Sequence, residues 1–235
     1  MIEFIPRPES GRRFAHERLV RLSDAGLDGV LRLDGLARYL QDAATDDWID
    51  SGFDPQATWV VRRTAVRVAE GGRWPSLGEL VTVTTWCAGT GPAWAERRTD
   101  VELHGALMVQ AVALWVSLDP SGRPLRLGGG FHSIWGEAAA GRRVSGRVPA
   151  APQPTDAKAR PWTIRLSDLD VLGHVNNAAV WAAVSEVAVA PVTSAALTHH
   201  GPLEGGQTVT LLTEPGRIWL VADTEVRVFA EITKA

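Results

Sequence analysis

Cysteine and long apolar runs are almost absent from this 235-residue sequence. The single cysteine, Cys87, cannot form a disulfide within the chain, which fits a reducing compartment. No apolar segment is long enough to span a bilayer, and residues 1–14 lack the apolar core of a signal peptide. We therefore expect a cytoplasmic protein that does not enter a membrane.

An excess of charge of one sign is also missing. The 24 Lys and Arg residues nearly balance the 27 Asp and Glu residues, which gives a formal net charge of -3. Because nucleic-acid-binding domains rely on an excess of positive charge, no nucleic-acid partner is expected. The arginine pairs at 62–63, 97–98 and 142–143 either form a local basic patch for an acidic partner or are separately solvated.

Signatures of several other site classes are missing as well. Residues 128–130 form a bare Gly-Gly-Gly sequence without the lysine of a phosphate-binding loop, and no G-x-S-x-G nucleophile motif occurs. His199 and His200 lack a second ligand pair at zinc-like spacing, so we interpret them as strand or loop residues. Cys87 has no activating histidine nearby in the sequence, which favours a buried thiol. Neither a metal nor a cofactor is expected.

Tryptophan, by contrast, is abundant, with ten residues. Hydrophobic residues make up 45% of the chain and charged residues 22%, which is typical of a globular protein. Because Trp buries a large area, an aromatic core is the first interpretation. The alternative is that some of the ten line an apolar ligand channel.

The chain contains one unit twice. The tetrapeptide RLSD occurs at 21–24 and again at 165–168, an offset of 144 residues. The same offset places Gly29 on Gly173. A repeat of this kind indicates two copies of one structural unit.

A segment with helical apolar spacing follows each copy. The first, LDGLARYLQDAATDDWIDSG, has Gly52 as a plausible stop. The second, VNNAAVWAAVSEVAVA, has Asn176 or Asn177 as a candidate cap and is expected to end at Pro191.

Strand-like segments rich in β-branched and aromatic residues follow each predicted helix. They span 59–70, 79–88, 93–103 and 106–118 in the first half, and 195–200, 207–213, 217–224 and 225–232 in the second. Each half is therefore expected to contain a strand, a helix and about four antiparallel strands, an α+β unit in which one sheet wraps one long helix. The second half is shorter, so an edge strand could be missing there.

A linker is predicted between the two units. Residues 137–160 are rich in Ala, Pro, Gly and Arg and have no apolar periodicity. The predicted domains are therefore 1–136 and 161–235.

The second copy of the repeat, SDLDVLGHVNN, concentrates polar residues at a strand-to-helix junction. Asp168, Asp170, His174, Asn176 and Asn177 lie within ten residues of one another. A carboxylate and an imidazole four residues apart can converge near a helix N-terminus, whose free N–H groups and positive dipole end suit an oxyanion. Such a carboxylate can act as a nucleophile or as a general base toward water.

The first copy serves as an internal control. It has Gly26 in place of Asp170, Val30 in place of His174, and Arg32–Leu33 in place of the two asparagines. This asymmetry favours one active half and one scaffold half. The alternative is that the polar residues only form a helix-entry turn with caps.

The segment SDLDVLGHVNNAAVWAAVSE resembles the D-x-D-x-x-G-H-V-N-N signature of hotdog-fold thioesterases, broadly the 4-hydroxybenzoyl-CoA thioesterase superfamily. The wider chain is similar to the plant-type fatty acyl-ACP thioesterase family, through DGLARYLQDAATDDWIDSGF, WVVRRTAVRV, GELVTVTTWCAGTG and ALWVSLDPSGRPLRL. The resemblance runs from about residue 16 to residue 190 and more weakly to the end. It implies a double hotdog, two tandem hotdog domains in an α+β fold, and hydrolysis of a fatty acyl thioester in fatty acid biosynthesis.

The resemblance also implies roles for individual residues. Asp170 matches the catalytic aspartate of the motif, and His174 matches the histidine that polarises the thioester carbonyl or orients water. Asn176 is grouped with these catalytic residues as a supporting residue. Asn177 and Trp181 are assigned to substrate binding.

Two departures from the plant pattern affect the site. The plant enzymes carry an asparagine two residues before the histidine, where this chain has Leu172. They also use a glutamate on a later strand, and Glu204 in THHGPLEGGQTV is the nearest candidate here for a further catalytic residue.

The expected substrate partner is a thioester of acyl carrier protein or of CoA, and the chain is expected to be a monomer or a homodimer. Three alternatives remain at this stage. The protein could bind acyl thioesters without cleaving them, it could be an acyl-CoA thioesterase outside fatty acid metabolism, or it could dehydrate 3-hydroxyacyl chains. The last alternative is disfavoured because the histidine motif of hotdog dehydratases is not found.

Overall fold

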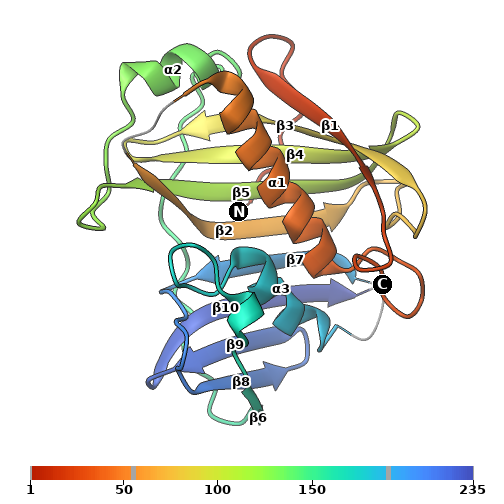
Figure 1. Cartoon of the computed structure of the whole chain (residues 1–235), viewed down its shortest axis with the longest axis vertical. Coiled ribbons are helices and arrows are strands. Elements are labelled where there is room, and N and C mark those ends of the chain that lie inside the picture. Colours follow the sequence, from red (N-terminus) through yellow and green to blue (C-terminus); the bar gives the residue numbers. More distant parts are fainter. Residues whose placement is uncertain (1, 54–56, 189–191, 235) are drawn as a thin grey trace.

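Ten antiparallel strands form one continuous sheet, and the two longer helices lie on the same face of it (Figure 1). The computed structural model describes residues 2–53, 57–188 and 192–234. The strands are β1 (Arg13–Leu19), β2 (Thr58–Val68), β3 (Leu80–Thr90), β4 (Trp94–Leu103), β5 (Ala106–Leu118), β6 (Lys158–Trp162), β7 (Val192–His199), β8 (Val209–Glu214), β9 (Arg217–Ala222) and β10 (Glu225–Lys234). The helices are α1 (Leu33–Ser51), α2 (Gly129–Trp135), the short 3₁₀ helix η1 (Leu166–Asp168) and α3 (Asn177–Ser185).

The strand order divides the sheet into two halves of five strands each. The first half runs β1-β3-β4-β5-β2 and the second runs β7-β10-β9-β8-β6. Antiparallel pairing of β2 with β7, in which Thr64 lies opposite Leu197, joins the halves edge to edge. Each half wraps one long helix, α1 or α3, so the predicted α+β double hotdog is confirmed.

The repeat is visible in the backbone hydrogen bonds of the two helix-entry loops. The Gly26 N–H donates to the Val30 carbonyl at 2.8 Å, and the Asp170 N–H donates to the His174 carbonyl at 2.8 Å. Each pair is followed by a helix, and the helices begin at Leu33 and Asn177, again 144 residues apart. The two halves therefore position the start of their helices in the same way.

A glycine in the left-handed region closes each loop. Gly29 has φ 75° and Gly173 has φ 77°. Their N–H groups donate to the carbonyls of Gly26 and Asp170, at 3.0 Å in both loops. A side chain with a Cβ rarely adopts this conformation, which explains why both copies keep glycine here.

The ends of α1 agree with the sequence, whereas the end of α3 does not. Gly52 follows α1 with φ 65°, as predicted, and the Asn176 side chain caps α3 by accepting from the Ala178 N–H at 2.9 Å. However, α3 ends at Ser185 instead of continuing to residue 190. The helix ends because the chain then enters β7 at Val192. Apolar spacing alone does not indicate where this change of direction occurs. The predicted stop at Pro191 lies outside the described residues.

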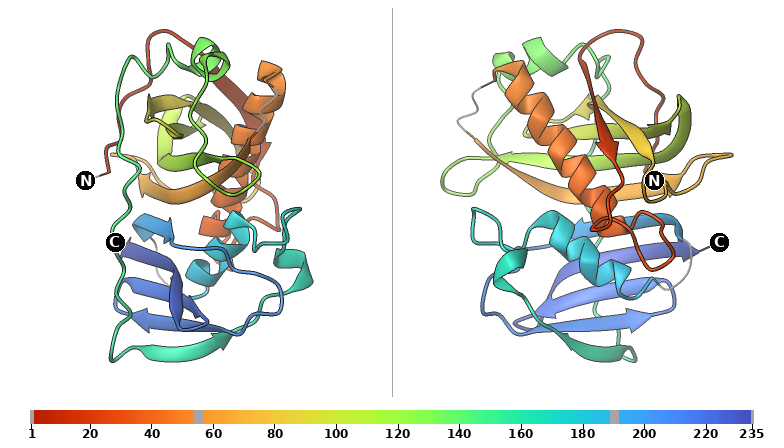
Figure 2. Two further views of the ribbon diagram at one scale, coloured as in Figure 1. Left: turned by 90° about the vertical axis from the view of Figure 1, so that its left-hand side faces the viewer. Right: turned by 45° about the vertical axis from the view of Figure 1, so that its right-hand side comes forward.

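The eight strands predicted with bounds are all present. Strands β1 and β6 are the strands expected before each helix, whereas helices α2 and η1 were not predicted. Strand β6 occupies the last three residues of the predicted linker and forms the edge of the second half, so an edge strand is not missing there. Helix α2 begins inside the Gly-Gly-Gly segment, at Gly129, and the glycines of its first turn obscured the helical pattern. The connection from α2 to β6 runs along the side of the sheet opposite the helices (Figure 2), where Ala151 and Ala157 pack against Trp219.

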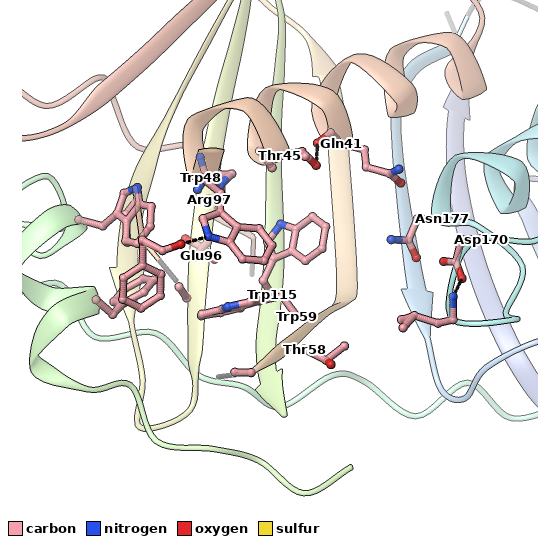
Figure 3. Close-up of a pocket in the computed structure, with 18 of the residues that line it drawn as sticks. Gln41, Thr45, Trp48, Thr58, Trp59, Glu96, Arg97, Trp115, Asp170 and Asn177 are labelled. Carbon is pink, nitrogen blue, oxygen red and sulfur yellow. Dashed lines mark hydrogen bonds between the residues drawn. The ribbon is translucent and has the colours of Figure 1, made fainter. Parts of the chain in front are cut away.

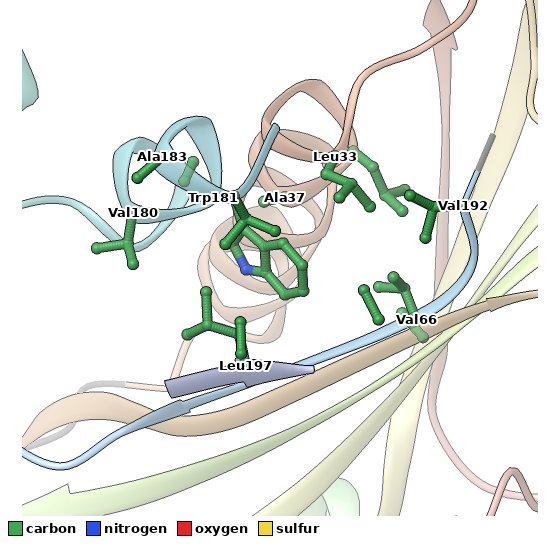
Figure 4. Packing of buried hydrophobic residues seen from close by; sticks show 14 of the residues in the cluster. Leu33, Ala37, Val66, Val180, Trp181, Ala183, Val192 and Leu197 are labelled. Atoms are coloured by element: carbon green, nitrogen blue, oxygen red, sulfur yellow. The ribbon is translucent and has the colours of Figure 1, made fainter. Parts of the chain in front are cut away.

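The two halves share one hydrophobic core between the helices and the sheet. Figure 4 shows Trp181 of α3 between α1 and strands β2 and β7, close to Ala37, Val66 and Leu197. Full burial of a large apolar side chain stabilises a fold by roughly 1.5–3 kcal/mol. Because side chains of both halves pack into this cluster, we expect the halves to fold as one unit. Among the described residues, no helix is both long and apolar enough to cross a membrane.

Candidate active site

A cavity of about 460 Å³ lies where the two halves meet (Figure 3). The first half supplies its apolar wall, which consists mainly of six aromatic residues. These are Trp48, Phe53, Trp59, Trp115, Phe131 and Trp135. The second half supplies the loop from Asp170 to Leu172 and the two asparagines at the start of α3. The volume falls within the range of small-molecule sites.

Asp170 is the carboxylate that the second half brings to this cavity. The loop fixes its backbone through the hydrogen bond to the His174 carbonyl, and its Oδ1 accepts from the Leu172 N–H at 2.9 Å. Its Oδ2 accepts no hydrogen bond from the residues that the structure describes. The half-buried carboxylate thus keeps one oxygen free for a substrate or a water molecule.

His174 and Glu204 lie side by side next to this loop. Their backbones form an isolated antiparallel bridge, which continues the pairing of the Val175 N–H with the Leu203 carbonyl at 2.8 Å. His174 is half-buried and Glu204 is exposed, and neither is among the described residues that line the cavity. The structure therefore brings the backbones of Asp170, His174 and Glu204 together, but it places only Asp170 at the cavity wall.

The two asparagines have different surroundings. The Asn176 side chain caps α3, as described above, and Asn177 is the first residue of the helix. Both line the cavity, so the N-terminal end of α3 faces it, with the positive end of the helix dipole. Trp181, one turn further along, is only 2% exposed and borders a smaller neighbouring cavity of about 30 Å³.

The predicted aromatic core is present, and four tryptophans line the cavity; that this cavity is a ligand channel stays a prediction. Trp48, Trp59, Trp115 and Trp135 line the large cavity, whereas Trp86, Trp162, Trp181 and Trp219 are buried in hydrophobic clusters. Phe131 stacks on Trp59 with a ring-centroid distance of 5.6 Å, and it contacts Trp135 at 5.0 Å. The second contact lies within α2. The helix is attached by the stacking of Phe131 on Trp59 and by an edge contact of Trp135 with Phe53 at 5.3 Å, and it forms one wall of the cavity.

Sequence reasoning missed the residues of α2 and the polar network beneath them. Asp47 of α1 is 1% exposed and accepts from Arg12, Arg97 and Trp135 at 2.7, 2.7 and 2.9 Å. Arg97 and Trp135 line the cavity. A signal was available, because Phe131 and Trp135 are four residues apart, the spacing of one helix face.

Cys87 also lines the cavity, and it is buried, as predicted. Burial raises the pKa of the Cys87 thiol, which keeps it protonated and a poor nucleophile. Among the described residues, no group of three side chains is arranged to hold a metal ion. His199 ends β7 and His200 follows it, as expected of strand or loop residues.

The corresponding position in the first half is filled by an ion pair. Arg32, which replaces Asn176, donates to the Ala25 carbonyl at 2.6 Å, the Ser23 carbonyl at 2.8 Å and Asp34 at 2.8 Å. Burial would raise the pKa of Asp34, but hydrogen bonds from Arg32 and Arg38 outweigh it and lower the pKa. This half therefore presents an arginine and a satisfied carboxylate where the second half presents Asp170 and its free oxygen.

Comparisons with known proteins agree with this geometry. The family model of the acyl-ACP thioesterase N-terminal domain matches residues 11–126, and that of the C-terminal domain matches residues 152–226. An uncharacterised protein of Mycobacterium tuberculosis is 25% identical over 217 residues, which cover 89% of this chain and 86% of that protein.

Two solved structures share the fold over nearly their whole length. The 12:0-ACP thioesterase from Umbellularia californica has a TM-score of 0.78 at 19% identity, covering 94% of this chain and 96% of that one. An acyl-ACP thioesterase from Bacteroides thetaiotaomicron has a TM-score of 0.79 at 17% identity, with the same coverage. At these identities the likeness shows a shared double-hotdog fold.

Proposed function

Since this chain belongs to the acyl-ACP thioesterase family and is a thioesterase, we propose that it hydrolyses fatty acyl thioesters of acyl carrier protein, or of CoA. The reaction would release a free fatty acid and the thiol carrier in fatty acid biosynthesis. One observation carries the proposal: Asp170, with one carboxylate oxygen free, faces an aromatic cavity at the N-terminal end of α3.

The cavity supports an acyl chain as the bound group. Its aromatic wall offers apolar surface, and burial of each methylene contributes roughly 0.8 kcal/mol to binding. The acyl chain would extend from Asp170 toward Trp48, Trp59 and α2, with the thioester carbonyl at the start of α3. Thr45, Glu96 and Arg97 add polar groups to the wall.

Asp170 would supply the attacking group. It would either attack the thioester carbonyl itself, or take a proton from a water molecule that attacks instead. In the second route a bond forms between the water oxygen and the carbonyl carbon, and the bond from that carbon to sulfur breaks. The proton passes from the water to Asp170 and then to the leaving thiolate.

The start of α3 would stabilise the negative charge on the carbonyl oxygen. Free N–H groups and the helix dipole favour an anion at this position, and the Asn177 amide is close enough to the cavity to contact the carbonyl. His174 would polarise the carbonyl or orient water, as the family motif implies. It directly follows Gly173 in the loop and is not among the described residues that line the cavity.

Replacement of Asp170 by Asn tests the proposal. The variant keeps an oxygen that can accept from the Leu172 N–H, so the loop should persist while the charge is lost. We expect at least a roughly 100-fold loss of turnover on a long-chain acyl thioester, because general base catalysis contributes on this scale. Release of free thiol from acyl-ACP and acyl-CoA panels, from short to long chains, provides the readout.

The first half offers a matched control. Asp28 makes a similar loop contact, accepting from the Val30 N–H at 3.0 Å, but it does not line the cavity. Asp28→Asn should keep wild-type turnover. Near-wild-type rates for Asp170→Asn would eliminate the assignment of Asp170. Binding of acyl thioesters by the wild-type protein without thiol release would instead indicate a non-catalytic binding protein.

A further inference from the structure

We infer that Gln41, on α1 of the first half, orients the water molecule that attacks the thioester. This inference rests on the proposed hydrolysis and selects its water route over direct attack by Asp170. It assigns a substrate-side role to a residue outside the D-x-D-x-x-G-H-V-N-N motif. The site would then be complete only when both halves are present.

Gln41 is half-buried at the cavity, and its amide oxygen has no hydrogen-bond partner among the described residues. That oxygen, Oε1, is inaccessible to solvent. The residue lines both the large cavity and the small one beside it. Figure 3 shows its side chain directed from α1 toward Asn177 and Asp170. An unpaired buried acceptor is costly, roughly 1–3 kcal/mol, which is explained if a reaction component normally occupies it.

The attacking water would lie in the large cavity, because both Gln41 and Asp170 line it. The small cavity beside it, which Asp170 does not line, has room for a second water molecule. Its volume of about 30 Å³ is enough for one water molecule. Besides Gln41, it is lined by Asn177 and by Trp115, whose Nε1–H is likewise buried and unpaired among the described residues. A buried water needs two to four polar partners, and these side chains offer both an acceptor and donors.

The internal repeat supports a contact between the Gln41 side chain of α1 and the start of α3. The residue 144 positions later is Ser185 on α3, and its Oγ donates to Asp34 Oδ1, at the start of α1, at 3.3 Å. The start of α1 is therefore contacted by a polar side chain from the opposite helix. In the same arrangement, Gln41 of α1 is the polar side chain that faces the start of α3.

The chemistry follows from the two acceptors. A water molecule that donates one hydrogen to Gln41 Oε1 and the other to Asp170 has its lone pair directed away from both, toward the carbonyl carbon. Asp170 takes the proton as the new carbon–oxygen bond forms, and Gln41 takes none. Gln41 therefore acts by orientation, and its loss should lower kcat more than it changes KM.

Gln41→Met and Gln41→Glu test the assignment. Methionine keeps the length of the side chain but cannot accept the hydrogen bond, so we expect kcat to fall about tenfold or more with KM within about twofold of wild type. Glutamate can still accept from water, so it should restore much of kcat. It also adds a carboxylate beside Asp170, and mutual repulsion should move the acidic limb of the kcat–pH profile to higher pH.

Ser185→Ala is the matched control, because Ser185 holds the equivalent place on α3 but faces the filled first-half position. It should leave kcat unchanged. Wild-type kcat in Gln41→Met, with Asp170→Asn inactive, would overturn the role of Gln41 and leave the proposed function standing. An unshifted kcat–pH profile in Gln41→Glu would also overturn the role of Gln41. This measurement serves as the test if Gln41→Met fails to fold. Loss of kcat in Ser185→Ala equal to that in Gln41→Met would also refute the role, because it would show a general effect of helix packing.

Discussion

Removal of the Asp47 carboxylate should destabilise the protein strongly. Asp47 joins four elements of the first half, because its side chain accepts from Arg12 before β1, Arg97 on β4 and Trp135 on α2. The Arg12 Nη2 also donates to the Asp47 carbonyl at 2.8 Å. In Asp47→Ala the backbone contact remains, but two guanidinium groups and an indole N–H lose their acceptor.

The size of the effect follows from burial. Asp47 is 1% exposed and Arg97 is 16% exposed, so water cannot readily replace the lost carboxylate. Breaking a buried ion pair by removing one partner typically costs about 3–5 kcal/mol. For a chain of this size each kcal/mol lowers Tm by about 2–4 °C, so the expected decrease in Tm is roughly 6–20 °C.

Equilibrium urea unfolding measures this change, and Asp50→Ala is the control. Asp50 binds the same Arg12 at 2.6 Å, but its side chain is 60% exposed. Exposed ion pairs contribute about 0–1 kcal/mol, so Asp50→Ala should have nearly the stability of the wild type. The reasoning is refuted if Asp47→Ala loses less than about 1 kcal/mol, or if the two variants lose the same amount.

Two further predictions concern the loops and the pH dependence of stability. Gly173→Ala and Gly29→Ala should each lower the free energy of unfolding in urea by about 1–2 kcal/mol, because both glycines have positive φ. Only Gly173→Ala should also lower thioester turnover. Equal turnover in the two variants would contradict the proposed site. Burial, together with the charge of Arg62 and the neighbouring His200, lowers the pKa of His199 to about 4. The unfolded chain therefore binds more protons between pH 6.5 and pH 4, so stability should fall as pH decreases through this window. His199→Gln should reduce the slope of the free energy of unfolding against pH between pH 6.5 and pH 4. An unchanged slope would disprove the contribution of His199.

Much of the fold could be predicted because the repeat and the periodicities are local properties of the sequence. The offset of 144 residues correctly aligned two helix-entry loops whose hydrogen bonds match pair by pair. The stop at Gly52 and the cap at Asn176 were visible because each depends on one residue and its immediate neighbours.

The cavity could not be predicted in the same way, because its wall combines side chains that are distant in the sequence. Trp48, Trp115 and Trp135 meet only after β4, β5 and α2 have packed around α1. Helix α2 is held by aromatic contacts with Phe53 and Trp59 rather than by helix propensity. Its glycine-rich start obscured the helix, and only the four-residue spacing of Phe131 and Trp135 indicated it. Gln41 lies in the segment DGLARYLQDAATDDWIDSGF, but that resemblance gives it no role. Its unpaired Oε1 and its place at both cavities become visible only in the structure.

The asymmetry between the two halves explains why one chain builds one such site. If the two hotdog units were identical, each would present the same polar loop to the helix of the other, and the chain would contain two such sites. Here the second-half loop keeps Asp170 and faces the aromatic wall of the first half, while the first-half loop has Gly26 and directs Arg32 inward to three hydrogen-bond partners. The first half therefore lacks the carboxylate, because Gly26 takes the place of Asp170, and an arginine occupies the place of the cap residue. In the proposed site the first half shapes the cavity with its sheet, α1 and α2 and contributes Gln41, while the second half contributes Asp170.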